Sequence, residues 1–190
     1  MEKMKTAVGV FAGLLKQESG KNAGKLLLRR RTEIPSIIPG KSFKGNWELP
    51  GGGVMEAEKV PYCHLVNELK REVEEETGIP IAIDPMPPMY PVLFKGPEGY
   101  DLALVTPIET SLESTKGETI WVNVEELNKL AREFEPADKK TGKDGKGLLG
   151  GYGKRMHCMA LRALYFSPNP TYSEDAGVML IEIQKGWQRE

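Results

Sequence analysis

The chain has 190 residues, 39% of them hydrophobic and 28% charged, and its formal net charge is −1 at pH 7. This composition is typical of a globular domain, and so small a net charge excludes a general electrostatic attraction to nucleic acid or to an acidic membrane. The two cysteines are too few for a disulfide scaffold, and no apolar run reaches the roughly 20 residues of a membrane-spanning helix. We therefore expect a cytoplasmic protein that has neither nucleic acid nor a membrane as a partner. An anionic substrate must then meet a local cluster of charges.

The first third of the chain predicts short strands joined by turns. Residues 6–15 are expected to form a first strand and residues 25–31 (KLLLRRR) its hairpin partner, because turn-forming residues separate these two apolar runs. Residues 47–49 are expected to form a short strand that runs into a glycine-rich turn at 50–53. Neighbouring strands with such short connections favour a mixed sheet over a purely parallel one.

Residues 61–77 have the periodicity of a helix. Leu65, Val66, Leu69 and Val73 recur at the spacing that places them on one helical face. A glycine, which commonly ends helices, follows the last of these residues. The pattern predicts an amphipathic helix that packs its apolar face against the rest of the domain.

The second half of the chain alternates between strand and helix patterns. Strands are expected at 79–83, 90–95, 102–108, 119–122 and 178–183, and helices at 124–134 and 155–165. An insertion rich in glycine and lysine lies at about 139–153, and a C-terminal extension begins at about residue 167. Because no repeat or linker divides the chain, residues 1–190 are expected to form one α+β domain.

Three glutamates near the end of the predicted helix suggest a metal site. Glu72, Glu75 and Glu76 are spaced i, i+3, i+4, so their carboxylates lie on one side of the helix, beside its apolar face. Carboxylates so close together repel one another, but they suit a hard divalent cation. Arg71 is placed to hold one of them through a charge-assisted hydrogen bond. The other interpretation of this segment is a solvated acidic helix end.

The segment from residue 51 to residue 79 resembles the Nudix box, the signature of the Nudix (MutT-like) hydrolases. The second half of the box is matched in full by REVEEETGI at 71–79, and its first half is matched by Gly52 and Glu58. The chain departs from the pattern in one place. Twelve residues separate Glu58 from the arginine of the box. This spacer is longer than that of the family by an insertion of five residues. Glu58 and Glu56 are therefore both candidates for the first acid of the box.

The resemblance covers most of the chain and implies a Nudix-type α/β/α sandwich with a mixed β-sheet. It implies hydrolysis of a diphosphate linkage in a nucleoside diphosphate-linked substrate, such as a nucleoside triphosphate, with Mg²⁺ or Mn²⁺ as the cofactor. The implied metal ligands are the Gly52 carbonyl and the carboxylates of Glu72, Glu75 and Glu76. The implied catalytic residues are these glutamates together with Arg71. Family members are often dimers, which leaves a homodimer open.

The resemblance also leaves alternatives open. The proton of the attacking water is accepted either by Glu72 or by a later acid, for which Glu113 and Glu118 are the candidates. The chain is either an enzyme or a non-catalytic nucleotide-binding or regulatory module that keeps the fold. A third reading is a pyrophosphohydrolase that acts on RNA 5′ ends.

Five charged residues outside the box are candidate substrate-binding residues: Arg29, Arg31, Glu118, Lys143 and Lys146. Arginines in a predicted strand either contact phosphate or form a salt bridge. The two lysines belong to the glycine-rich insertion, which is either a mobile lid over the substrate or a disordered surface segment.

Overall fold

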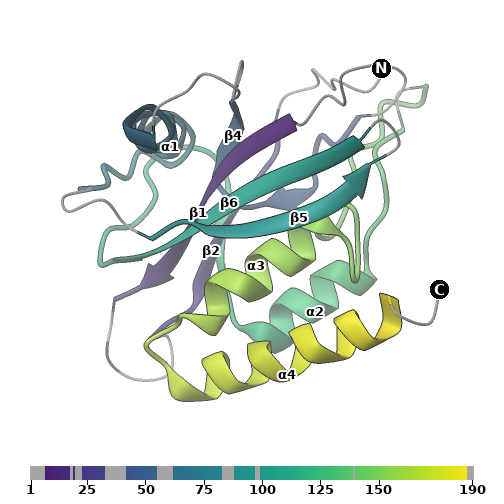
Figure 1. The fold of residues 1–190 in the computed structure, drawn as a ribbon. Coiled ribbons are helices and arrows are strands. Elements are labelled where there is room, and N and C mark those ends of the chain that lie inside the picture. The colour runs from purple at the N-terminus through teal and green to yellow at the C-terminus, as the bar shows by residue number, and fades with distance from the viewer. Residues whose placement is uncertain are drawn as a thin grey trace, which may run out of the picture.

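The computed structural model describes residues 7–17, 19, 23–32, 42–54, 62–82, 88–96, 99–138 and 140–187. A seven-stranded mixed sheet lies at its centre (Figure 1). The strands are β1 (Ala7–Lys16), β2 (Leu26–Arg30), β3 (Trp47–Glu48), β4 (Gly51–Val54), β5 (Tyr90–Gly96), β6 (Gly99–Thr110) and β7 (Thr119–Val122). They follow the order β3-β2-β1-β6-β5, with β4 paired to β1 and β7 paired to β2.

The sheet is mixed because its two long strands, β1 and β6, run parallel, while its other pairings are antiparallel. Val10 of β1 lies beside Leu104 of β6 on one side and beside Gly52 of β4 on the other. The pairing with β1 therefore carries the glycine-rich segment to the middle of the sheet.

Helices cover both faces of the sheet (Figure 1). One face carries α1 (Tyr62–Thr77), and the other carries α2 (Val124–Arg132), α3 (Arg155–Tyr165) and α4 (Pro170–Trp187). The expected α+β class and the α/β/α sandwich are confirmed. Among the described residues, no helix is long and apolar enough to cross a membrane.

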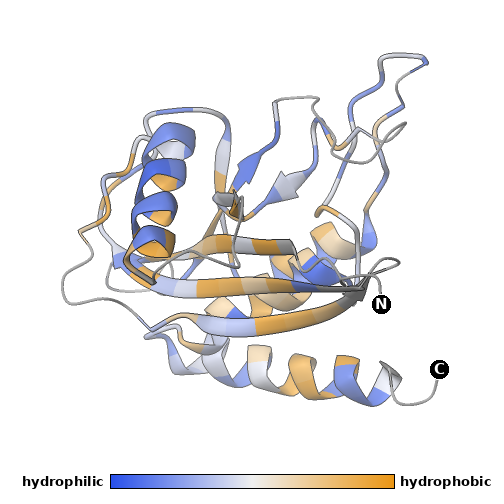
Figure 2. Cartoon of the chain, turned by 45° about the horizontal axis from the view of Figure 1, so that its top comes forward, coloured by the Kyte–Doolittle hydropathy of each residue, from blue (hydrophilic) through white to orange (hydrophobic). Residues whose placement is uncertain are grey.

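The core has two halves because side chains alternate along the central strands. Ala12 and Leu14 of β1 pack with Leu69 and Val73 of α1, whereas Leu15 packs on the opposite side with α2 and α3. Figure 2 shows the hydrophobic residues of α1 turned toward the sheet and its hydrophilic residues turned away. The predicted apolar face of this helix is confirmed.

The last element corrects a prediction. The sequence predicts a strand at 178–183, and this prediction is wrong, because these residues lie within α4. Ala176 and Ile183 are buried, and Met179 and Leu180 pack against the same core, so the inward side chains recur at helical spacing. A short apolar run is compatible with either structure, and here packing against α3 decides for the helix.

Two predictions near α1 are also wrong among the described residues. Residues 79–82 form no strand, although Ile79 and Ile81 are buried in the core beneath α1. The turn expected at 50–53 is strand β4 from residue 51 onward, because β1 supplies a partner backbone. The other predicted helices and strands are confirmed, with bounds that shift by a few residues.

Candidate active site

One wall of the site is formed by alternate side chains along β2 and the residue that follows it. Leu27 packs toward α1, so Arg29 and Arg31 direct their side chains to the same face of the sheet. Glu48 lies opposite Arg29 in the antiparallel pair of β2 and β3, and it is only 3% exposed. Its carboxylate lies 2.6 Å from Arg29 Nη2 and 3.0 Å from Arg31 Nη1. One buried carboxylate therefore holds both arginines.

The last turns of α1 bring a second carboxylate to this wall. Because Leu69 and Val73 are fully buried, the neighbouring Glu76 is directed toward the sheet. Glu76 Oε1 lies 2.5 Å from Arg29 Nη2, and Glu76 Oε2 accepts a hydrogen bond from the backbone N–H of Gly51 at 2.9 Å. Glu76 thus joins α1 to both β2 and β4.

Glu76 has an unusual protonation equilibrium. Burial raises its pKa to about 7, because the charged carboxylate loses its water. The Arg29 guanidinium and the Gly51 N–H lower this pKa, whereas the charges of Glu48 and Glu72 raise it. Glu76 is therefore divided between its two protonation states near neutral pH, and a nearby cation would favour the charged state.

Two glycines let the backbone of β4 lie close to its neighbours, Gly52 to α1 and Gly51 to β1. A Cβ at Gly52 would lie 2.9 Å from the carboxyl carbon of Glu72. Gly51 has a φ of +143°, which side chains other than glycine rarely adopt, and a Cβ there would collide with the Val10 carbonyl oxygen. Gly52 is therefore needed for the Glu72 carboxylate to reach the β4 backbone, and Gly51 is needed for β4 to lie against β1.

Arg71 holds the outer carboxylates of the helix. Its guanidinium donates to Glu68 at 2.7 Å, to Glu72 at 2.5 Å and to Glu75 at 2.7 Å. The hydrogen bond to Glu68 and the charge of Glu72 raise the Arg71 pKa further above its ordinary value. Arg71 therefore positions the glutamates of α1, as the sequence predicts for one of them.

A pocket of about 310 Å³ lies between α1 and β2. Glu72, Glu75 and Glu76 line it from the helix, and positive charge is supplied by Arg29, Arg30, Arg31 and Lys116. The structure thus brings the three predicted glutamates together with the two predicted arginines. We call this cavity the glutamate pocket.

Lys116 lines the glutamate pocket and is not predicted by any sequence pattern. Its loop is fastened to the end of α1, where Ser114 Oγ and the Thr115 N–H each donate to the Thr77 carbonyl at 2.9 Å. Lys116 Nζ donates to the Glu74 carbonyl at 3.0 Å, so the loop also satisfies carbonyls that the helix end leaves free. Lys116 is identified as a pocket residue only by this contact between the loop and the helix, which are far apart in the sequence.

The other predicted substrate residues do not line the pocket, and each pairs with another charged residue. Glu118 pairs with Arg30 at 2.9 Å and does not line the cavity. Lys143 and Lys146 approach Glu135 at 3.1 and 4.0 Å, and neither lines the cavity.

The glycine-rich insertion is fastened to the domain over its described residues, 140–153. Backbone bridges join Lys143 to Asp138 and Lys146 to Glu135, and Leu148 is fully buried beside β3. These contacts do not fit a disordered segment.

The described residues include Glu113, a candidate base, but neither candidate for the first acid of the box. Glu113 is held by Lys16 Nζ at 2.6 Å and by the Trp121 indole N–H at 2.9 Å. These hydrogen bonds lower its pKa, and it does not line the glutamate pocket. Glu56 and Glu58 lie outside the described residues.

The glutamates do not converge on a single point. Within the described parts of the chain, no three His, Cys, Asp or Glu side chains lie close enough together to hold a metal ion. Their oxygens are instead bonded to Arg29 and Arg71. A metal ion would have to compete with these two guanidinium groups.

A family model described as the NUDIX domain matches residues 5–144. The chain is similar to the MutT protein of Methanosarcina mazei Go1 (28% identity over 67% of this chain and 83% of that chain, TM-score 0.47). It is similar to a MutT Nudix hydrolase of Burkholderia pseudomallei (24%, 64% and 85%, TM-score 0.44) and to the NrtR Nudix domain of Shewanella oneidensis, complexed with ADP ribose (19%, 62% and 72%, TM-score 0.43). No curated protein gave a match.

Proposed function

The chain belongs to the Nudix family, and on this premise we propose that it is a divalent-metal-dependent hydrolase of a diphosphate linkage in a nucleoside diphosphate-linked substrate. Nudix hydrolases generally cleave pyrophosphate linkages in nucleoside diphosphate derivatives. The observation that carries the proposal is a single pocket with Glu72, Glu75 and Glu76 on one side and cationic side chains on the other. Carboxylates suit a divalent cation and cationic groups suit phosphate oxygens, so the cavity matches both parts of a metal–diphosphate complex.

The donor atoms around the pocket fit Mg²⁺ or Mn²⁺, which prefer oxygen ligands. Glu72, Glu75 and Glu76 supply carboxylates, and the backbone of Gly52 lies directly against Glu72. Glu76 is a buried carboxyl group that a bound cation would keep charged. We assign these three carboxylates and the Gly52 carbonyl as the metal ligands. Binding requires the side chains to turn from their guanidinium partners.

The proposed chemistry places two tasks on the chain itself, which are to accept a proton and to position the substrate. When bound, the ion supplies charge neutralisation of the diphosphate oxygens and a more acidic water. Of the three candidate bases, Glu72 lines the pocket, whereas Glu113 and Glu118 do not. We therefore assign proton acceptance to Glu72, with Arg71 as the positioning residue that orients it.

Lys116 is the best candidate for a substrate phosphate contact. The arginines of the pocket are already paired with carboxylates, Arg29 and Arg31 with buried Glu48 and Arg30 with Glu118. Lys116 forms no ion pair with a carboxylate among the described residues and bonds only to a backbone carbonyl. Its positive charge is therefore available to a phosphate, while the arginines maintain the wall of the pocket.

A second candidate function is nucleotide binding without catalysis. The observation in its favour is that Arg29 and Arg71 already form ion pairs with the three glutamates. If these ion pairs persist in the presence of a divalent ion, the pocket binds a nucleotide but does not activate water.

The test is a release assay over a substrate panel. Purified chain would be incubated with Mg²⁺, Mn²⁺ or a chelator, and with nucleoside triphosphates, dinucleoside polyphosphates, nucleotide sugars or RNA bearing a 5′ triphosphate or cap. Glu75→Gln is the test variant, and Glu125→Gln, an exposed glutamate on α2, is the matched control. We expect metal-dependent release that falls at least ~100-fold in Glu75→Gln and is unchanged in Glu125→Gln.

The other outcomes are equally informative. Unchanged turnover in Glu75→Gln would contradict the assignment of the pocket. A folded protein that binds nucleotides but releases nothing would establish the non-catalytic module. Release from the RNA substrates alone would identify an RNA 5′-end pyrophosphohydrolase.

A further inference from the structure

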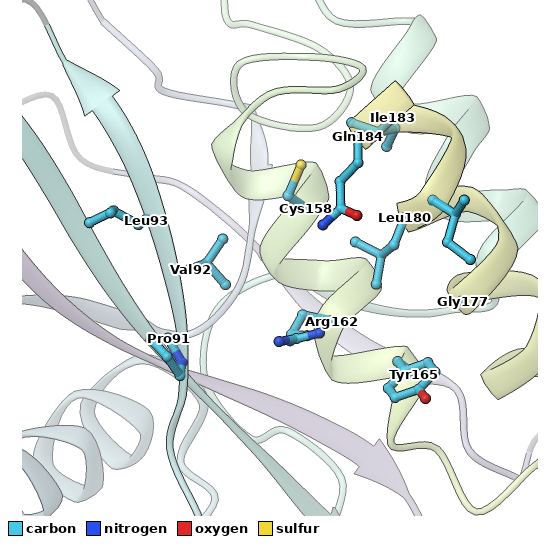
Figure 3. Close-up of a pocket in the computed structure, with 11 residues that line it drawn as sticks. Pro91, Val92, Leu93, Cys158, Arg162, Tyr165, Gly177, Leu180, Ile183 and Gln184 are labelled. Atoms are coloured by element: carbon cyan, nitrogen blue, oxygen red, sulfur yellow. The ribbon is translucent and has the colours of Figure 1, made fainter. Parts of the chain in front are cut away.

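A second cavity lies on the opposite face of the sheet from the glutamate pocket, between the edge strand β5 and helices α3 and α4 (Figure 3). Its volume is about 380 Å³. Cavities that bind small molecules measure roughly 300 to 1,000 Å³. The two cavities share no residue among those the structure describes, so this one is a separate candidate site.

The walls of this cavity are mainly apolar. Val92 and Leu93 line it from β5, and Leu180 and Ile181 line it from α4. Leu93 is 59% exposed, Ile181 is 53% exposed and Tyr165, also in the lining, is 44% exposed. Large apolar side chains that gather in the open around a cavity mark a binding surface more often than isolated ones do.

Arg162 of α3 is the one charged residue in the described lining. Figure 3 shows it in the space between β5 and α4, with Gln184 of α4 on the same side of the cavity. Cys158 also lines the cavity, but burial raises the pKa of its thiol to about 11, so it stays neutral. The cavity therefore combines apolar walls with a single positive charge.

Arg162 differs from the other described arginines in having no partner among the described residues. The others pair with carboxylates or stack on a ring: Arg29, Arg30, Arg31, Arg71, Arg132 and Arg155. A half-buried guanidinium among apolar side chains loses hydration without gaining a counter-ion. An anion with an apolar body would supply what the cavity lacks.

We propose that this cavity binds a small amphipathic carboxylate, such as a medium-chain acyl acid. The carboxylate accepts hydrogen bonds from the Arg162 guanidinium and the Gln184 amide, and the chain lies along Leu180 and Ile181. Arginine is suited to this role because its planar fork matches a carboxylate at two points. Each further buried methylene should tighten binding about fourfold, which corresponds to ~0.8 kcal/mol.

A second copy of the chain fits the cavity less well. Pairing of two β5 edges would bring no acid to Arg162, because this strand (YPVLFKG) contains none. Pro91 also lacks the N–H that a strand needs at its edge for continued pairing, a common protection against such association. The charge pattern therefore favours a soluble anion over a second copy.

Calorimetric titration of the full chain with decanoate tests this proposal. Decan-1-ol and decyltrimethylammonium are the neutral and cationic comparison ligands. We expect saturable 1:1 binding of decanoate, at least ~10-fold weaker binding in Arg162→Gln, and partial recovery in Arg162→Lys, which keeps the charge but not the planar fork. Arg132→Gln, which removes an arginine that stacks on Tyr152, is the matched control and should bind like the wild type.

Other results would overturn the proposal. These are no saturable binding, equal binding of the alcohol, or unchanged binding in Arg162→Gln with the fold verified by circular dichroism. A dimer that dissociates in Ile181→Lys would show instead that a second copy occupies the cavity. The proposal does not depend on diphosphate hydrolysis, so either can fail alone.

Discussion

The two faces of the sheet differ in how their buried polar groups are paired and charged. On the α1 face, Glu48 and Glu76 share the guanidinium of Arg29, and Glu76 has a pKa raised to about 7 by burial. On the α2–α4 face, the fully buried His157 has a pKa lowered to about 4, chiefly by burial and also by the charge of Arg132. Burial favours the neutral form of both Glu76 and His157, but only the α1 face keeps a buried ion pair, that of Glu48 and Arg29.

The hydrogen bonds of His157 explain its neutrality. The Gly153 N–H donates to Nδ1 at 3.1 Å, so Nδ1 carries no proton, and Nε2 then donates to Asn128 Oδ1 at 2.7 Å. A second proton on the ring would face the Gly153 N–H. This satisfied pair joins α3 to α2 and has a structural role, while the charged cluster on the opposite face lines an open pocket and has the features of a functional site.

The largest expected effect separates two glutamates that share Arg71. Glu72→Gln should lower kcat by about 10³-fold, because it removes the proposed base and metal ligand. Glu68→Gln should change kcat less than about threefold, since Glu68 contacts Arg71 but does not line the glutamate pocket. Steady-state kinetics of both variants provides the measurement, and similar losses in both would remove the distinction.

The neutral pair on the opposite face should affect stability and leave chemistry unchanged. His157→Ala should lower the free energy of unfolding by about 2 to 4 kcal/mol, because it leaves a cavity and an unsatisfied Asn128. Urea unfolding gives this value. The kcat per folded molecule should equal that of the wild type, and a large loss of kcat would show that the two faces are coupled.

Lys116 and Lys143 distinguish a pocket residue from an insertion residue. Lys116→Gln should lower kcat/KM about 10-fold, the effect of losing one charge-assisted hydrogen bond to phosphate. Lys143→Gln should leave kcat/KM unchanged, because Lys143 pairs with Glu135 outside the pocket. A larger loss for Lys143 would restore the lid interpretation of the insertion.

The smallest expected effect is a pH dependence of stability. Between pH 6.5 and 4, the unfolded chain protonates His157 while the native chain does not, so the contribution of His157 to stability should fall as pH falls. The slope approaches about 1.4 kcal/mol per pH unit within this window. Glu76 acts in the opposite direction, because its raised pKa removes stability as pH rises from about 4.5 to 7.

The contribution of His157 is isolated by difference. Unfolding free energies of the wild type and His157→Gln at pH 7 and pH 5 should converge as the pH falls. A constant difference between the two proteins would contradict the depressed pKa of His157.

Local sequence patterns predict those parts of the site that lie on a single helix. Glu72, Glu75 and Glu76 share a side of α1 because of helical spacing alone, and the Leu69–Val73 stripe predicts which side faces the sheet. Gly52 was identified through the family resemblance, and its close approach to Glu72 is seen in the structure.

The remaining site residues depend on contacts between distant segments. Glu48 is important because β3 pairs with β2 in a register that places it opposite Arg29, and no local pattern fixes that register. Lys116 reaches the pocket because its loop caps α1. The sequence predicts a strand at 178–183, within α4, for a related reason, since only packing on α3 shows which apolar residues of this segment face inward.

The most direct test of the central claim is whether the three glutamates exchange their arginine partners for a divalent ion. Titration of Mn²⁺ into the protein, followed by loss of the free-ion electron paramagnetic resonance signal, measures this in the absence of substrate. We expect the wild type and Glu68→Gln to bind Mn²⁺ equally, and Glu75→Gln and Glu76→Gln to bind it at least ~10-fold more weakly. Equal binding by all four proteins, or no binding by the wild type, would contradict the assignment of the glutamate pocket as a metal centre.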